Sequence, residues 1–233
     1  MKKILLAVLV ASAVATFQAG AIIVTVDKVN GYTGGDGEFN VSPPNGLGSG
    51  YAAVDLYKNS FGNIGFGTFC INRSVYINVP GQYNATVIPS GIDPNNGNQI
   101  SLGTAWLFLQ FAGGTLPGYN YTPGAGRSGS AFQLQLAIWI LEGQYPIASI
   151  VPGSDPFLNA AIAAFGGTLV GAEADNNGAY SVGVLGLTTI NPDGSPGAQV
   201  QPMLTLLPDG GSVLILLGMG LSGLAVFARK FRA

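Results

Sequence analysis

Two residues in this chain, Cys70 and Gln135, have side chains that could react with each other. Cys70 is the single cysteine, so the chain cannot form a disulfide within itself. A lone cysteine is usually a small buried apolar residue, but an unpaired thiol in an exported protein is unusual. Gln135 lies within a largely apolar stretch, residues 130–144. Because an unpaired buried amide costs about 1–3 kcal/mol, its carboxamide is expected either to bond to backbone groups or to be chemically committed.

The stretch 130–144, SAFQLQLAIWILEGQ, predicts a helix. Ser128 or Ser130 is expected to cap its start, and Gly143 and Pro146 to end it. Apolar side chains occupy nearly every side, which indicates a buried helix. Cys70 falls on a predicted strand, residues 64–71. Further strands are predicted at 22–29, 38–41, 51–57, 74–79, 82–88, 180–189 and 198–207.

Two more helices are predicted, at 102–111 and at 155–165. The second has Asp155 as its cap and Pro156 at its first position. Strands, then helices, then strands again predict a β-rich fold, either a β-sandwich or a barrel, with a helical insertion at about 102–165. Residues 22–207 are expected to form this single domain.

The composition limits the possible functions. The chain has 233 residues, of which 48% are hydrophobic and 9% charged, with 36 Gly and no His. Such a composition favours a loop-rich extracellular domain, and the lack of His removes the commonest general base and zinc ligand. We therefore expect no metal and no cofactor. Residues 22–207 hold four basic residues against ten acidic ones, so no basic patch for nucleic acid is expected.

Both ends of the chain resemble export signals. Residues 1–21 combine a basic start, an apolar segment and a small-residue end, Ala19-Gly20-Ala21, which indicates a secretory signal peptide. Residues 212–228 carry no charge and are close to the shortest length that spans a membrane. A basic cluster follows directly. The positive-inside rule then places this end in the cytoplasm and residues 22–207 outside. The cluster consists of Arg229, Lys230 and Arg232.

The C-terminal module as a whole resembles the PEP-CTERM type of sorting signal. It has a short Pro-containing motif, an apolar helix and a terminal basic cluster within residues 208–233. The motif reads Pro-Asp-Gly-Gly, as in a variant branch of that family. The resemblance implies an exosortase-type sorting enzyme as partner, transient membrane anchoring, and delivery to the surface of bacteria that make exopolysaccharide. The motif residues are Pro208, Asp209, Gly210 and Gly211.

The segment Phe69-Cys70, followed by Leu134-Gln135-Leu136-Ala137-Ile138-Trp139, resembles the thioester domains of bacterial surface adhesins. In that family a Cys on a strand and a Gln on a helix form an internal thioester that acylates an amine on the target. The resemblance implies that Cys70 and Gln135 are the reactive pair. Such an activated acyl group lasts only where water is kept out. The side chains expected to keep water away from the bond, called the dry wall below, are those of Phe69, Phe132, Ile138 and Trp139.

The leading hypothesis is thus an exported surface or extracellular-matrix protein that adheres to an amine-bearing or polysaccharide target. The alternative is a passive structural protein of the biofilm or exopolysaccharide layer, in which Cys70 is simply buried. A secreted hydrolase is disfavoured, because Glu142 and Asp155 fit better as a helix-end carboxylate and a helix cap than as a catalytic pair. We therefore do not expect an enzyme.

Overall fold

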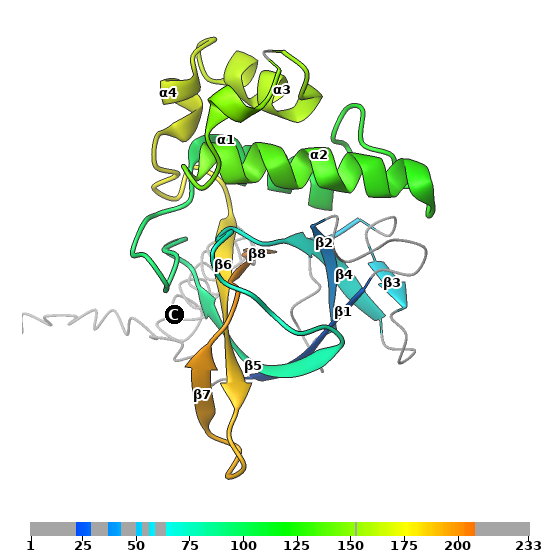
Figure 1. The fold of residues 1–233 in the computed structure, drawn as a ribbon, viewed down its shortest axis with the longest axis vertical. Helices are drawn as coiled ribbons and strands as arrows, with labels where there is room; N and C mark the ends of the chain where they lie inside the picture. The colour runs from blue at the N-terminus through cyan, green and yellow to red at the C-terminus, as the bar shows by residue number, and fades with distance from the viewer. Residues whose placement is uncertain are drawn as a thin grey trace, which may run out of the picture.

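The computed structural model describes residues 22–28, 37–42, 50–52, 56–58, 64–151 and 153–207. The expected signal peptide and the expected sorting signal lie outside these residues. The described part is β-rich, with one antiparallel sheet and a group of helices (Figure 1). Its strands are β1 (Ile22–Lys28), β2 (Glu38–Ser42), β3 (Leu56–Lys58), β4 (Ile64–Phe69), β5 (Gly81–Ile88), β6 (Val182–Ile190), β7 (Pro196–Gln199) and β8 (Met203–Leu206).

The sheet curls into a nearly closed barrel. Its strands follow the order β3-β4-β2-β1-β5-β6-β7, and β8 also pairs with β6. A bridge between Cys70 and Met203 then joins the end of β4 to the start of β8. The Ile71 N–H donates to the Pro202 carbonyl at 3.2 Å beside it. The barrel therefore closes at Cys70, through residues that lie far apart in the sequence.

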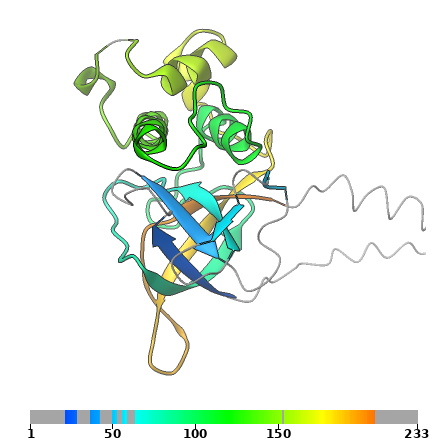
Figure 2. The ribbon, with the colours of Figure 1, turned by 90° about the vertical axis from the view of Figure 1, so that its right-hand side faces the viewer.

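The helices form a layer over one end of this barrel (Figures 1 and 2). They follow β5 in the chain and precede β6, as the sequence predicted for a helical insertion. Helix α2 lies across the barrel end, with α3 and α4 on its far side. The elements are α1 (Leu102–Ala112), α2 (Ala125–Leu141), the short 3-10 helix η3 (Ile147–Ser149), α3 (Pro156–Ala164) and α4 (Leu169–Glu173).

One apolar core runs from the barrel interior to the helices. Val24 and Val26 of β1 are fully buried while Ile23 is 48% exposed, which is the alternation expected of a strand with one face inside. Phe69 of β4 meets Phe111 of α1 edge-on, with ring centroids 4.9 Å apart. This packing fixes the helical layer to the rim of the barrel where β4 ends.

Three expectations about the elements are corrected. Residues 74–79 form no strand: Ile77 and Val79 pack against the core from an irregular segment, so the apolar alternation does not reflect strand pairing. The predicted strand 198–207 is split into β7 and β8, with Pro202, which has no N–H to donate, in the gap. Helix α2 begins at Ala125 rather than near Ser130.

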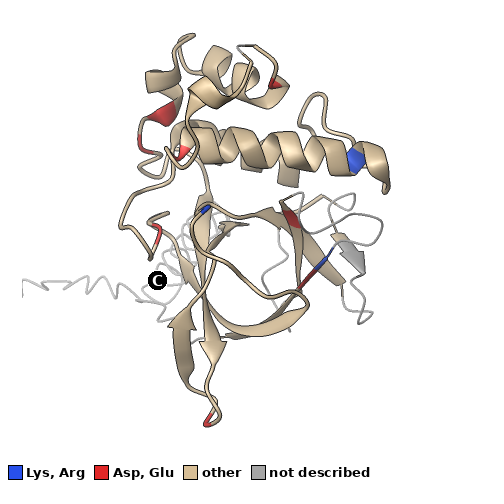
Figure 3. Ribbon diagram, in the orientation of Figure 1, with Lys and Arg blue, Asp and Glu red and all other residues tan. Residues whose placement is uncertain are grey.

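Charged residues are sparse over the described fold (Figure 3). Among the described residues, the structure contains no helix with the length and apolarity needed to cross a membrane.

Candidate functional site

Gln135 lies on the buried face of α2. The start of this helix differs from the sequence prediction, whereas its end agrees with it. Ser130 does not cap the helix: its Oγ donates to the Gly126 carbonyl at 3.2 Å and accepts from the Asn120 N–H at 3.1 Å. The helix ends at Leu141, and Gly143 follows with φ +65°, as its sequence predicted. Gln135 is 1% exposed, on the face turned toward the barrel rim.

Cys70 and Gln135 are in direct contact. The Cys70 thiol donates to Oε1 of Gln135 at 3.1 Å, and the Cys70 backbone N–H donates to the same oxygen at 3.1 Å. Nε2 of Gln135 donates in turn to the Cys70 carbonyl at 2.7 Å. Because Cδ is bonded to Oε1, the sulfur lies next to an acyl carbon whose oxygen already accepts a backbone N–H. A sulfur near the acyl carbon and a donor on its oxygen are two of the features that attack of sulfur on the carboxamide needs.

Gly37 allows this close approach. A Cβ at Gly37 would lie 2.4 Å from Cβ and 2.5 Å from Cγ of Gln135, and its φ is +100°. Glycine is the residue that adopts this backbone conformation without strain. Gly37 directly precedes β2, so the start of that strand is shaped around the Gln135 side chain. No local pattern in the sequence indicates this role, because the contact is between distant segments.

The expected dry wall is partly present. Phe69 and Ile138 are fully buried, and Trp139 is half-buried against the core. Phe132, in contrast, is 53% exposed and forms no part of the wall. On a helix, Phe132 and Ile138 lie on opposite flanks of Gln135, and the flank of Ile138 is the one that packs inward.

Burial is the largest influence on the pKa of the Cys70 thiol. It raises the pKa of Cys70 to about 12, while Trp139, the Cys70 backbone N–H and Gln201 oppose this shift by favouring the charged form. Gln201 is 7% exposed and its Nε2 donates to the Asn72 carbonyl at 3.1 Å. The thiol is therefore protonated near neutral pH, in a site that contains a second carboxamide that sequence reasoning missed.

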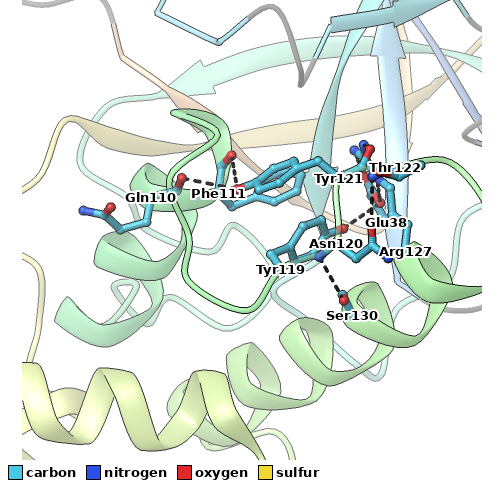
Figure 4. A network of polar contacts seen from close by, with 9 residues as sticks. All are labelled: Glu38, Gln110, Phe111, Tyr119, Asn120, Tyr121, Thr122, Arg127 and Ser130. Carbon is cyan, nitrogen blue, oxygen red and sulfur yellow. Dashed lines mark hydrogen bonds and ion pairs between the residues drawn. The ribbon is translucent and has the colours of Figure 1, made fainter.

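A buried ion pair between Arg127 and Glu38 also fixes α2 to the barrel (Figure 4). Arg127 of α2 and Glu38 of β2 are both fully buried and form a salt bridge. The Tyr119 hydroxyl donates to Glu38 at 2.7 Å, and Nη1 of Arg127 donates to the Tyr121 carbonyl at 2.7 Å. Burial raises the pKa of Glu38, and Arg127 and Tyr119 oppose that shift.

Glu142, Asp155 and Asp93 each accept a hydrogen bond from a backbone N–H. Glu142 accepts the Ser101 N–H at 3.0 Å, and burial raises its pKa. Asp155 caps α3 by accepting from the N–H groups of Phe157 and Leu158, both at 2.9 Å, as predicted. Asp93 accepts from Asn72 and from the Asn95 N–H. Within the described ranges, no three His, Cys, Asp or Glu residues cluster as metal ligands would.

The residues of the expected sorting motif and basic anchor lie beyond residue 207 and so outside the described part. No family model, no curated protein and no solved structure matches this chain. The contact between Cys70 and Gln135 is therefore the main structural clue to what the protein does.

Proposed function

We propose that this protein is an exported surface or matrix protein that attaches covalently to amines through a thioester between Cys70 and Gln135. The observation that carries the proposal is the placement of the Cys70 thiol 3.1 Å from Oε1 of Gln135, inside a buried site. Of the described chain, this is where a nucleophile and an acyl group meet with water excluded. The target is an amine on a neighbouring surface or in an amine-bearing polysaccharide.

Formation of the bond needs no external oxidant or cofactor. The sulfur attacks Cδ of Gln135, a C–S bond forms, and the C–N bond to Nε2 breaks. The thiol proton leaves with the nitrogen as ammonia. The Cys70 backbone N–H, which donates to Oε1 at 3.1 Å, is placed to stabilise negative charge on that oxygen during attack.

The raised pKa of Cys70 determines when the thiol loses its proton in this step. A free thiolate is scarce at neutral pH when burial raises the pKa of Cys70 to about 12, so the proton must move as the sulfur attacks. The thiol already donates to Oε1, which gives the proton a first acceptor on the group under attack. The same burial protects the finished thioester from water.

The ends of the chain support the location in this proposal. A signal peptide at 1–21 would deliver the domain across the inner membrane, and the module at 208–233 would hold it there until an exosortase-type enzyme acts. A thioester on the domain outside the membrane would then face amines outside the cell.

A second function remains a candidate because one observation favours it. Both polar atoms of the Gln135 amide bond to the Cys70 backbone, which is sufficient to satisfy a purely structural glutamine. The protein would then be a passive component of the biofilm or exopolysaccharide layer, with Cys70 a buried thiol.

A measurement of the intact mass of the exported protein distinguishes the thioester from the purely structural role. A thioester predicts a deficit of about 17 Da, because ammonia is lost when sulfur displaces the amide nitrogen. Methylamine should convert that deficit to a gain of about 14 Da, because an N-methyl amide replaces the original amide. The Cys70→Ala variant should show neither change. A full mass, with one thiol that titrates after the protein is unfolded, would contradict the thioester and leave the structural role.

A further inference from the structure

The indole N–H of Trp139 is a buried donor beside the reactive pair. Trp139 follows Gln135 by one helical turn, so the two side chains are neighbours on α2. Its Nε1 is shielded from solvent and makes no hydrogen bond to the described residues. It nevertheless lies close enough to the Cys70 thiol to favour that group's charged form. A buried donor without a partner is costly, and this one lies near the thiol of the proposed thioester.

A cation lies over the same ring. The guanidinium carbon of Arg73 is 5.9 Å from the ring centroid of Trp139 and 4.8 Å from that of Tyr145. Arg73 follows Cys70 closely in the chain, and Tyr145 follows α2, so Arg73 links the two segments that carry the reactive pair. A cation over an aromatic face attracts its electron density. The indole N–H should therefore become a stronger donor.

We infer that Trp139 donates a hydrogen bond to the sulfur when an amine opens the thioester, and that Arg73 positions and polarises its ring. This inference rests on the proposed function. The amine nitrogen attacks Cδ of Gln135, a C–N bond forms, and the C–S bond breaks. Sulfur leaves with the electron pair as a thiolate, which Trp139 stabilises. A proton from the amine then passes to the sulfur.

The buried site makes such a donor necessary. Burial raises the pKa of Cys70 to about 12, so a departing thiolate is poorly stabilised without a hydrogen bond. The Cys70 backbone N–H is directed at Oε1 of Gln135, where it remains on the carbonyl side of the bond that breaks. Nε2 of Gln201 gives one of its two N–H groups to the Asn72 carbonyl, and Gln201, like Trp139, favours the charged form of the thiol. Trp139 is the nearby donor with no competing acceptor among the described residues.

The test compares full-length exported wild type with Trp139→Phe, which keeps an aromatic ring but removes the N–H. The rate at which methylamine abolishes the mass deficit should fall about tenfold or more in this variant, as expected for loss of a hydrogen bond to a charged group. Arg73→Gln should slow opening by a smaller factor. Lys28→Gln, which removes an exposed cation of β1, is the matched control and should leave the rate unchanged.

A second readout separates a donor from a packing residue. The Cys70 thiol released by methylamine is labelled with a small methanethiosulfonate over a range of pH. Its labelling profile should move to higher pH in Trp139→Phe, because the thiolate loses a hydrogen bond. If the variant fails to form the thioester, the profile of its free Cys70 thiol is compared with that of methylamine-treated wild type, with the same shift expected.

The outcomes distinguish the two proposals. A wild type of full mass would overturn the proposed function. A wild type with the deficit, whose opening rate is unchanged by Trp139→Phe, would overturn the inference alone. A slower rate with an unmoved labelling profile would also overturn it, since packing loss changes the rate without changing the thiol's proton affinity.

Discussion

Gln135 pairs with Cys70 as a neighbouring strand would. The β2–β4 ladder runs to the pair Glu38 and Phe69. At the next residue, the Cys70 N–H donates to Oε1 of Gln135 at 3.1 Å, and its carbonyl accepts from Nε2 at 2.7 Å. A helix side chain thus extends the strand pairing by one residue. The same two hydrogen bonds hold the acyl carbon beside the thiol.

This pairing predicts the effect of replacing Gln135 by methionine. Gln135→Met keeps an unbranched side chain but leaves the buried N–H and carbonyl of Cys70 without partners. We expect the free energy of unfolding to fall by about 2–4 kcal/mol. Urea denaturation measures the change. Gln133→Met, on the exposed side of α2, should change stability by less than about 0.5 kcal/mol. Equal losses in the two variants would contradict the pairing role.

Replacing Gly37 tests how closely the start of β2 packs against the Gln135 side chain. In Gly37→Ala the new methyl group would meet Gln135 Cβ at 2.4 Å, so the carboxamide must move away from Cys70. Gly97→Ala is the matched control, since Gly97 has φ +79° but a methyl group added there would have nothing within 4 Å. Both variants carry the cost of a positive φ. We expect Gly37→Ala to be less stable by about 1–3 kcal/mol more than the control, and to lose any mass deficit.

The buried ion pair between Glu38 and Arg127 predicts strong coupling. Glu38→Gln or Arg127→Met alone leaves a buried partner group without its ion pair, so each should cost about 3–5 kcal/mol. The double variant should lose much less than the sum of the two. A double-mutant cycle by urea denaturation gives the coupling free energy. Additive losses would show that the two side chains contribute independently.

Glu142 predicts a pH dependence of stability. Burial, with a smaller contribution from Asp93, raises its pKa in the folded protein. The folded state then binds this proton more tightly than the unfolded state, so the stability it contributes is complete below the unfolded pKa and is lost as pH rises through the folded pKa. Glu142→Gln stays neutral and can still accept the Ser101 N–H. Its stability relative to wild type should therefore increase from about pH 4 to pH 8, and a difference that is constant with pH would contradict this.

Sequence patterns within a few residues correctly predicted the start of α3, the end of α2 and the strand β1. Asp155 caps α3, Pro156 is its first residue, and Gly143 follows the end of α2. The β-branched run at the start of the domain forms β1. Each of these depends on capping, backbone dihedrals or side-chain branching within a few residues.

The start of α2 shows why other parts could not be predicted. Glycines such as Gly126 and Gly129 have low helix propensity, and a charged residue is seldom fully buried. Both residue types nevertheless lie in α2, where Arg127 is buried because it meets Glu38 from a distant strand. Gly37 and Gln201 contribute to the site through similar long-range contacts. The proximity of Cys70 and Gln135 was expected from a resemblance to thioester domains and is present in the structure. The covalent bond stays a prediction.

Under the proposed function, the closing of the barrel at Cys70 and Met203 implies an order of events. The site draws on β4, α2 and the segment before β8, so no short fragment of the chain contains it. A chain still emerging from a membrane has, under the proposed function, its cysteine and its glutamine apart, and neither residue alone is an activated acyl group. Under the proposed function, the reactive bond forms only after the last strand is in place, when the protein is already beyond the cell's own amines.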